Sequence, residues 1–399
     1  MFPKSHVVLG LVLTACTLTS VGFAADEEEE AKYPFSIKLV DEDDKPVNGA
    51  TAGLGAYFGK EGGSLPIEDG TGWHYWQGAT SDANGIVNFS DGGKSGHICV
   101  VARHPAQELV GIWKIDPDKL EPAASAEMVI IKMYPATRIT GKIASRDFAE
   151  LKRPLGFTHA YLKYANGVAF SFEPTDQTFH CFAPPGDYEL RLYGQDLHKI
   201  DLKVSVKAGQ REVDLGAIDL PATRLAFMIG KPATELPDIE CWKNCRGVKL
   251  ADLKGKCVIL DFWGYWCGPC VYRMPELFEL YDKHHDRGLE IVGVHVDLGT
   301  DEKEPVDTVE KLDERLAKIR KDVWKGKDVP YPVAIVTGKE TSYGTVIETG
   351  TARSPLAALY GVQWYPTLIL IDRQGKVVGH FHPHLAEHIK LLESLLKDQ

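Results

Sequence analysis

The feature that most constrains this chain is an apolar segment that leads into two closely spaced cysteines. Residues 257–263 read Cys-Val-Ile-Leu-Asp-Phe-Trp, and six of the seven are apolar. Such a run is typical of a central strand that is covered on both faces. Cys267 and Cys270 follow, and the residues after them predict a helix that extends to about Asp282. The segment therefore predicts a buried strand, a turn with two cysteines and a helix.

The spacing of Cys267 and Cys270 predicts redox chemistry. Two cysteines separated by two residues at the start of a helix can close a disulfide while the first sulfur stays exposed. Unpaired N–H groups and the helix dipole stabilise the thiolate of Cys267, so we expect Cys267 to attack and Cys270 to resolve the mixed disulfide. Pro269 fits the first helical turn. The alternatives are a structural disulfide and a zinc site, but zinc needs a second ligand pair, for which only Cys241 and Cys245 qualify, at an unsuitable spacing.

The rest of residues 225–399 predicts an α/β unit. Strands and helices alternate, which implies a sheet covered by helices. Besides the strand at 257–263 and the helix that follows the cysteines, strands are expected at 289–296, 332–336, 367–371 and 376–380, and helices around 306–323, from 354 and from about 384.

The segment 261–270, Asp-Phe-Trp-Gly-Tyr-Trp-Cys-Gly-Pro-Cys, resembles thioredoxin. Residues 230–233, 250–256 and 360–375 resemble the exported TlpA/ResA branch of the redoxin (AhpC/TSA) superfamily. The resemblance covers the whole C-terminal unit and implies a thioredoxin fold. It also implies thiol–disulfide exchange with disulfide-containing protein substrates through a redox-active Cys267–Cys270 disulfide, without another cofactor or a metal.

Asp261 lies in the middle of the predicted buried strand. Burial of an ionised carboxylate there is unfavourable, so we expect a raised pKa for Asp261. Members of the resembled family carry a buried acid at this position that takes or gives the proton of the inner cysteine, here Cys270. The alternative is a structural Asp that is hydrogen-bonded to the backbone.

The resemblance also implies a surface that docks the substrate. Pro366 occupies the family's cis-proline site, beside the cysteine pair, where the backbone of Tyr365 pairs with a substrate strand. Trp266, Gly268 and Pro269 complete the expected docking residues.

One position departs from the family. Many exported reductases of this branch have a Glu three residues after the second cysteine, and this chain has Arg273. Either the cysteine pair meets a cation there, or Arg273 faces solvent without a role, and the second is the expectation. The departure puts specificity for cytochrome-maturation substrates in doubt.

Residues 1–24 predict a signal peptide for export. A positively charged start precedes the apolar stretch 7–15, and small residues lead to the cleavage site. A lipoprotein box with Cys16 as the lipid anchor is the alternative, and simple cleavage is favoured. The apolar run is too short for a membrane span. We therefore expect a periplasmic or cell-envelope protein, with residues 25–32 as an acidic spacer.

Two all-β sandwiches are expected between the spacer and the C-terminal unit, at 33–135 and 136–222. Short alternating runs broken by Gly, Pro and Asp predict strands and turns. Residues 81–89 and 183–190 resemble carboxypeptidase-regulatory-like β-sandwich domains. Neither unit carries a visible catalytic set. Residues 73–76, Trp-His-Tyr-Trp, either bind a sugar or a partner or, as we favour, pack in a strand.

The remaining cysteines and histidines predict no second site. Cys241 and Cys245 either form an auxiliary disulfide or stay unpaired, and Cys257 is expected in the core. Without Cys16, seven of the eight cysteines remain, so at least one is free or bonds another chain. Four histidines near the C-terminus are expected at the surface and not around a metal: His380, His382, His384 and His388.

These features together predict a multidomain chain with two all-β sandwiches followed by an α/β thioredoxin fold. The net charge of −11 argues against nucleic acid as a partner. The predicted function is an exported thiol–disulfide oxidoreductase that reduces or exchanges protein disulfides and draws electrons from a membrane thiol carrier. One alternative is a thiol peroxidase, although Gly264 replaces the Thr or Ser that such enzymes carry three residues before their cysteine. The other is a surface binding protein with an accessory redox domain.

Overall fold

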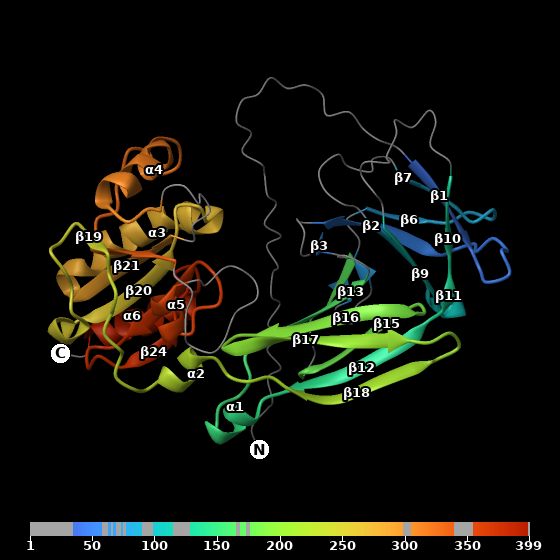
Figure 1. Ribbon diagram of the computed structural model, residues 1–399, viewed down its shortest axis with the longest axis horizontal. Coiled ribbons are helices and arrows are strands. Elements are labelled where there is room, and N and C mark those ends of the chain that lie inside the picture. Colours follow the sequence, from blue (N-terminus) through green and yellow to red (C-terminus); the bar gives the residue numbers. More distant parts are fainter. Residues whose placement is uncertain are drawn as a thin grey trace, which may run out of the picture. The chain divides into compact units, whose positions relative to one another are not determined.

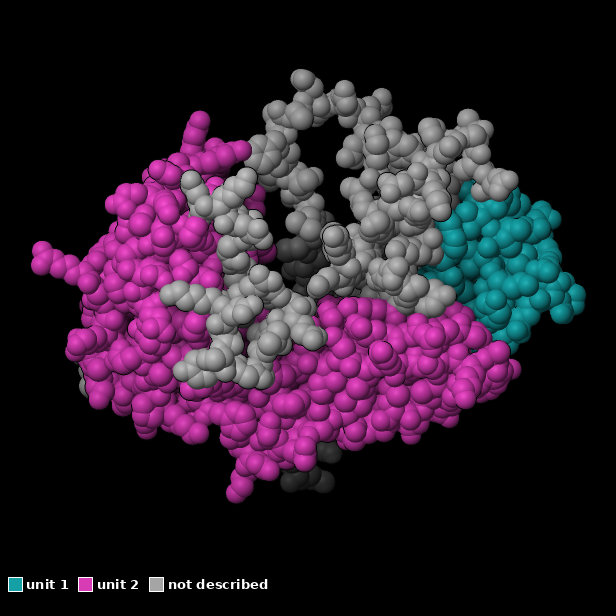
Figure 2. Space-filling view, in the orientation of Figure 1, with its two compact units in different colours: residues 1–66, 74–136 teal, residues 67–73, 137–399 magenta. Residues whose placement is uncertain are grey.

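The chain divides into two compact units, one of residues 1–66 and 74–136 and one of residues 67–73 and 137–399, which Figure 2 shows in two colours. The computed structural model describes residues 35–57, 63–64, 67–68, 73–74, 77–89, 99–114, 128–164, 168–172, 176–297, 305–338 and 354–397. The expected signal peptide at 1–24, the alternative lipid anchor Cys16 and the spacer at 25–32 lie outside these residues, as do the side chains of residues 73–76.

The first unit consists of two β-sheets around one buried cluster. The cluster includes Ile37, Leu39, Val87 and Val100, and Ile37 and Val87 alternate with more exposed residues along their strands. One sheet has the order β10 (Val129–Lys132), β1 (Phe35–Val40), β7 (Ile86–Phe89). The other has the order β11 (Tyr134–Pro135), β9 (Leu109–Lys114), β8 (Cys99–His104), β2 (Thr51–Tyr57), β3 (Gly63–Ser64), and β6 (Gln77–Thr80) also pairs with β2.

The second unit begins with two further sheets. One has the order β15 (Thr178–Ala183), β12 (Thr137–Ala144), β18 (Glu212–Asp219). The other contains β17 (Leu197–Val206), β16 (Gly186–Gly194), β13 (Thr158–Tyr164), β14 (Val168–Phe172) and β4 (Ile67–Glu68). A short helix, α1 (Arg146–Glu150), follows β12. The short strand β5 (Trp73–His74) contains the boundary at which the chain returns from the second unit to the first, between residues 73 and 74.

The strand β16 shows why these segments form sheets with one covered face. Tyr188, Leu190 and Leu192 are buried, whereas Arg191 and Tyr193 between and beyond them are only half-buried. This period of two separates an inner apolar face from an outer face.

The C-terminal part of the second unit is a six-stranded mixed sheet with helices (Figure 1). Its order is β19 (Cys241–Lys243), β22 (Val333–Thr337), β21 (Leu289–Asp297), β20 (Cys257–Trp263), β23 (Thr367–Ile371), β24 (Val377–His380), in which β20, β21 and β22 are parallel. The helices are α2 (Arg224–Met228), α3 (Gly268–His284), α4 (Val309–Asp322), α5 (Pro355–Leu359) and α6 (Ala386–Lys397), with 3₁₀ turns η4 (Leu250–Leu253) and η5 (His285–Arg287).

Every residue of the central strand β20 is buried, as its apolar sequence predicts. Cys257, Ile259 and Trp263 share one buried cluster with side chains of α3, α4 and α6. The alternate residues of β20 share a second cluster with α2 and α5. Because side chains alternate along a strand, Asp261 lies on the same face as Ile259 and Trp263, towards α3. The expectation that Cys257 is a core residue is confirmed.

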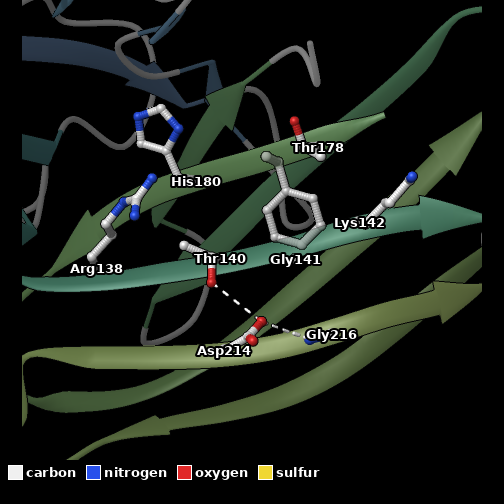
Figure 3. A pocket seen from close by; sticks show the side chains of 9 residues that line it. Arg138, Thr140, Gly141, Lys142, Thr178, His180, Asp214 and Gly216 are labelled. Carbon is white, nitrogen blue, oxygen red and sulfur yellow. Dashed lines mark hydrogen bonds between the residues drawn. The ribbon is translucent and has the colours of Figure 1, made fainter. Parts of the chain in front are cut away.

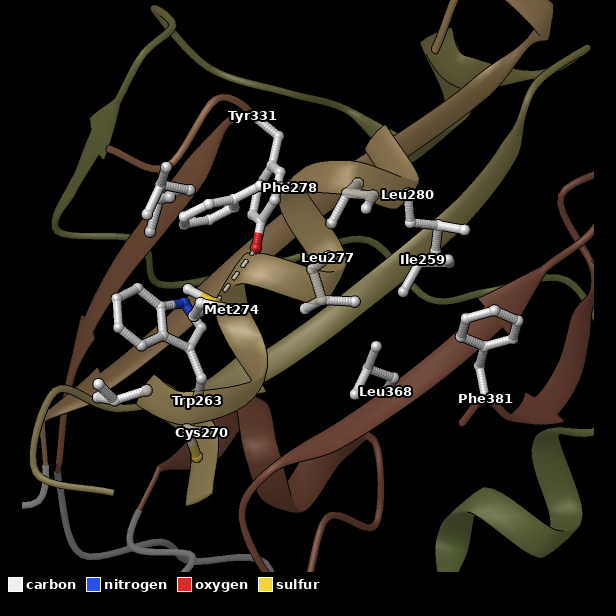
Figure 4. Close-up of a cluster of buried hydrophobic side chains, with 14 of the residues drawn as sticks. Ile259, Trp263, Cys270, Met274, Leu277, Phe278, Leu280, Tyr331, Leu368 and Phe381 are labelled. Carbon is white, nitrogen blue, oxygen red and sulfur yellow. Dashed lines mark hydrogen bonds between the residues drawn. The ribbon is translucent and has the colours of Figure 1, made fainter. Parts of the chain in front are cut away.

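Figure 4 shows how α3 packs in the first of these clusters. Met274, Leu277 and Phe278 recur at the spacing of one helix face and are each at most 2% exposed. Tyr331 packs against Phe278, and its hydroxyl donates a hydrogen bond to the sulfur of Met274 (3.3 Å). The indole N–H of Trp324 donates to the carbonyl of Val271 (2.8 Å), which fixes the start of α3.

Polar contacts join the β-sheets of the second unit to its α/β part. The imidazole Nε2 of His380 lies 2.8 Å from a carboxylate oxygen of Asp196, whose side chain is 5% exposed. Arg153 donates a hydrogen bond to the carbonyl of Ala226 (2.8 Å). These contacts link the turn between β16 and β17 with β24, and the segment after α1 with α2.

The predicted fold class, all-β sheets followed by an α/β thioredoxin fold, is confirmed. The expected limits of the individual domains stay predictions. Within the described part of the chain, no helix combines the length and the apolar composition needed to span a bilayer.

Candidate functional site

The two expected redox cysteines lie at the junction of β20 and α3 and are joined by a disulfide. Cys267 is the N-cap of α3, and its sulfur accepts a hydrogen bond from the backbone N–H of Cys270 (3.2 Å). Pro269 stands in the first turn, where its missing N–H leaves no helical bond unmade. The helix therefore begins at the first sulfur, which is where a negative charge is stabilised.

The expectation of an exposed first sulfur is wrong for the disulfide form. Cys267 is 6% exposed and Cys270 is 2% exposed, and both belong to the buried cluster below α3. Gly268 and Pro269 between them are exposed. The loop is thus accessible through its middle residues, while both cysteines are largely buried in the disulfide form.

The indole of Trp266 is fixed beside the disulfide by two contacts. Its Nε1 donates a hydrogen bond to the carbonyl of Val296 at the end of β21 (2.9 Å). Its ring meets the ring of Tyr365 edge to face, with centroids 5.3 Å apart. The peptide bond between Tyr365 and Pro366 is cis. The expected docking residues from two distant loops are therefore next to one another.

Gly264 is required by the position of Trp266. A Cβ atom at residue 264 would lie 2.3 Å from the indole Nε1 of Trp266, a ring that its hydrogen bond holds in place. A Thr or Ser of the kind expected in a thiol peroxidase does not fit there without displacing this ring.

Asp261 lies fully buried on β20, at 1% exposure, and Arg273 on α3 faces it. An Nη atom of Arg273 is 3.8 Å from one carboxylate oxygen of Asp261. The second oxygen of Asp261, Oδ2, has no hydrogen-bond partner among the described residues. Burial raises the pKa of Asp261 from its ordinary 3.8 to about 6, although the charge of Arg273 opposes this shift.

The expectation that Arg273 faces solvent is wrong. Its side chain is only 14% exposed, and burial lowers its pKa while the carboxylate of Asp261 opposes that change. Arg273 follows Cys270 by three residues on α3, so the two lie on one side of the helix. The spacing of three residues from Cys270 is the feature of the sequence that indicates a position of Arg273 near the cysteine pair.

Among the described residues, Cys241 and Cys245 lie outside this site. Cys241 and Cys245 are free thiols, so of the two alternatives the unpaired one holds, and the sulfur of Cys241 donates to the carbonyl of Asp307 (3.4 Å). The expectation that His380 lies at the surface is wrong, since its side chain is only 13% exposed and is bonded to Asp196. His382 is half-buried as well, and burial lowers its pKa to about 4.

A pocket of about 290 Å³ lies on the sheet β15–β12–β18 (Figure 3). Asp214 accepts hydrogen bonds there from the hydroxyl of Thr140 (3.3 Å) and the backbone N–H of Gly216 (2.9 Å). Arg138 and Lys142 add positive charge to its wall. Its lining residues include no thiol, so it is separate from the redox site.

The pKa of Asp261 predicts an unusual dependence of stability on pH. Between pH 3.8 and about 6 the folded chain keeps a proton on Asp261 that the unfolded chain has lost, so stability falls as pH rises through this window. Asp261→Asn removes this loss, because asparagine does not ionise. As pH rises from 4 to 7, the free energy of unfolding of the variant should therefore increase relative to that of the wild type, on the order of 3 kcal/mol in total.

Urea unfolding of both proteins at several pH values tests this expectation. Arg273 is charged in both proteins at pH 4 and at pH 7, and its attraction to the ionised Asp261 of the wild type is already contained in the pKa of about 6. Curves that stay parallel over this range would show that Asp261 is not a buried acid with a raised pKa.

Residues 231–380 match the AhpC/TSA family. A protein of Bacillus thuringiensis subsp. konkukian named thiol-disulfide oxidoreductase ResA is 36% identical over 152 residues, which cover 38% of this chain and 67% of that relative. A protein of the same name from Bacillus cereus is 35% identical over 159 residues, which cover 39% of this chain and 71% of the relative. Among solved structures, a thiol-disulfide isomerase of Corynebacterium glutamicum matches with a TM-score of 0.32 and 24% identity over 42% of this chain and 97% of the other.

Proposed function

Because this chain belongs to the ResA-type thiol–disulfide oxidoreductases, we propose that Cys267 and Cys270 are its redox pair and that they reduce disulfide bonds of protein substrates. One observation carries this assignment of roles. Cys267 is the N-cap of α3, and its sulfur accepts a hydrogen bond from the first turn of the helix. Both features favour the thiolate of Cys267 over that of Cys270.

In the first step, the thiolate of Cys267 attacks one sulfur of the substrate disulfide. A bond forms between Cys267 and that sulfur, and the other substrate sulfur leaves as a thiolate. The exposed Gly268 and Pro269 admit the substrate to the attacking atom. Trp266 and Tyr365, whose rings are in contact, form the adjoining docking surface together with Pro366.

In the second step, Cys270 gives its proton to Asp261 and attacks the sulfur of Cys267. The bond between Cys267 and the substrate breaks, and the substrate leaves as a thiolate that takes up a proton. Two electrons have then passed to the substrate, and the Cys267–Cys270 disulfide has formed. The raised pKa of Asp261, about 6, makes its carboxylate a stronger base than an exposed Asp. Arg273 keeps part of the group ionised near neutral pH, because its positive charge opposes the raised pKa.

A dithiol donor must return two electrons to the Cys267–Cys270 disulfide after each cycle. We assign this role to a membrane thiol carrier, because the pattern of residues 1–24 favours export to the periplasm or cell envelope. Simple cleavage of this segment is favoured over a lipid anchor at Cys16. The Gly268–Pro269 dipeptide resembles that of thioredoxin and supports the reducing direction.

The roles of the two cysteines predict different behaviour of two serine variants. Cys267→Ser should abolish dithiothreitol-driven reduction of insulin disulfides, because it removes the nucleophile. Cys270→Ser should retain the first step and accumulate mixed disulfides, which non-reducing electrophoresis detects. Cys245→Ser is the matched control and should keep full turnover, since Cys245 is a free thiol outside the site. Faster alkylation of Cys270 than of Cys267 at neutral pH would reverse the assigned roles.

The role of Asp261 predicts a selective kinetic defect. Asp261→Asn should slow release of the substrate from the mixed disulfide by about 10²-fold, because general-base assistance of Cys270 is lost, and should change the first attack much less. Stopped-flow fluorescence resolves both steps, since Trp263 and Trp266 flank the site. Asp282→Asn, an exposed change on the same helix, should leave both steps unchanged. Equal effects of Asp261→Asn on the two steps would argue for a structural carboxylate.

A further inference from the structure

A row of aromatic residues leads from Cys267 onto the β-sheets of the second unit, through ring contacts and, between Tyr365 and Trp364, through adjacent positions in the chain. Trp266, next to Cys267, meets Tyr365, and Trp364 precedes Tyr365 in the same loop. The ring of Trp364 meets the ring of Tyr193 on β16, with centroids 6.2 Å apart. The row thus passes from the α/β part of the unit to its β-sheets.

The row continues across two neighbouring strands, β16 and β13, which lie side by side in Figure 1. Tyr193 is paired across the strands with His159, and their ring centroids are 5.3 Å apart. His159 in turn stacks with Phe157 at 5.9 Å. The hydroxyl groups of Tyr161 and Tyr193 lie 3.1 Å apart, which holds the middle of the row together.

Hydrogen bonds fix the two parts of the unit where the row crosses between them. Gln363, one residue before Trp364, is bonded to the imidazole of His198 on β17 (3.2 Å). Asp196 in the turn between β16 and β17 is bonded to His380 on β24. These two contacts therefore hold together the two parts of the unit that the row connects.

Two large members of the row are accessible to a partner. Phe157 is 54% exposed and Trp364 is 41% exposed. Burial lowers the pKa of His159 to about 4, so this imidazole is neutral near pH 7 and the row carries no charge there. Exposed rings that share one uncharged row are suited to apolar and aromatic side chains, which pack on ring faces and edges.

We propose that this aromatic row binds an extended segment of the protein substrate on one side of its reactive cysteine, through apolar or aromatic side chains. The proposal rests on the proposed function, because the row adjoins Trp266 and Tyr365, the residues assigned to substrate docking. This continuity favours a substrate segment over a second copy of the chain as the occupant. Successive ring centroids from Trp364 to Phe157 lie between 5.3 and 6.2 Å apart, and an extended segment advances about 3.3 Å per residue. Roughly six residues of such a segment therefore span the row.

Single-turnover reduction of synthetic peptides by the full-length reduced protein tests the proposal. Each peptide carries one cysteine in a disulfide with a chromophoric thiol, whose release is measured. One peptide has Trp and Phe on the N-terminal side of its cysteine, a second has them on the C-terminal side, and a third has Gly and Ser at all these positions. The wild type should reduce one of the two aromatic peptides about fivefold or more faster than the Gly/Ser peptide. The other aromatic peptide should lack this advantage, because the row lies on one side of the disulfide.

Phe157→Ser should lose most of this preference, which is measured as the ratio of rates for the two peptides. Leu391→Ser, a matched change of an exposed apolar residue on α6, should keep it. An equal preference for both aromatic peptides, or a preference that survives in Phe157→Ser, would overturn the proposal. So would a dimeric wild type that Phe157→Ser converts to a monomer in light scattering, because a second copy would then occupy the row. If the wild type fails to reduce even the Gly/Ser peptide, the proposed function itself is wrong.

Discussion

The start of α3 at Cys267 is the constraint on which the arrangement of the candidate site depends. Cys267 serves as the N-cap, so its sulfur occupies the place where a capping oxygen usually accepts a hydrogen bond from the first turn. This arrangement requires a strand that ends just before the helix begins. The strand is β20, which is buried on both faces and places Asp261 on the side towards α3.

Because the disulfide is largely buried, a substrate must bind to the residues around it. The loop of Trp266 is fixed to β21, and the loop of Tyr365 contacts it from the other side. The β-sheets of the second unit reach this second loop through Tyr193 and Trp364. Under the proposed function, these sheets extend the docking surface beside Cys267 and Cys270.

The local parts of this arrangement could be predicted from the sequence, because they depend on residues close together in the chain. The apolar run 257–263 coincides with β20, and Ser354 before a proline caps α5. Two features could not be predicted. Packing against Asp261 and the core decides that the flexible Arg273 turns inward, and the contact of Asp196 with His380 joins residues 184 positions apart. No local pattern records such contacts, and the second one holds together the two parts of the unit that the aromatic row connects.

Titration of the thiolates in the reduced protein tests the central claim, that the start of α3 activates the first sulfur. Thiolate absorbance at 240 nm, followed against pH, measures this directly. One thiol should titrate below the ordinary cysteine value of about 8.5, and this transition should be lost in Cys267→Ser but kept in Cys270→Ser. If no thiol titrates below that value, or if the low transition survives in Cys267→Ser, the helix start does not activate Cys267.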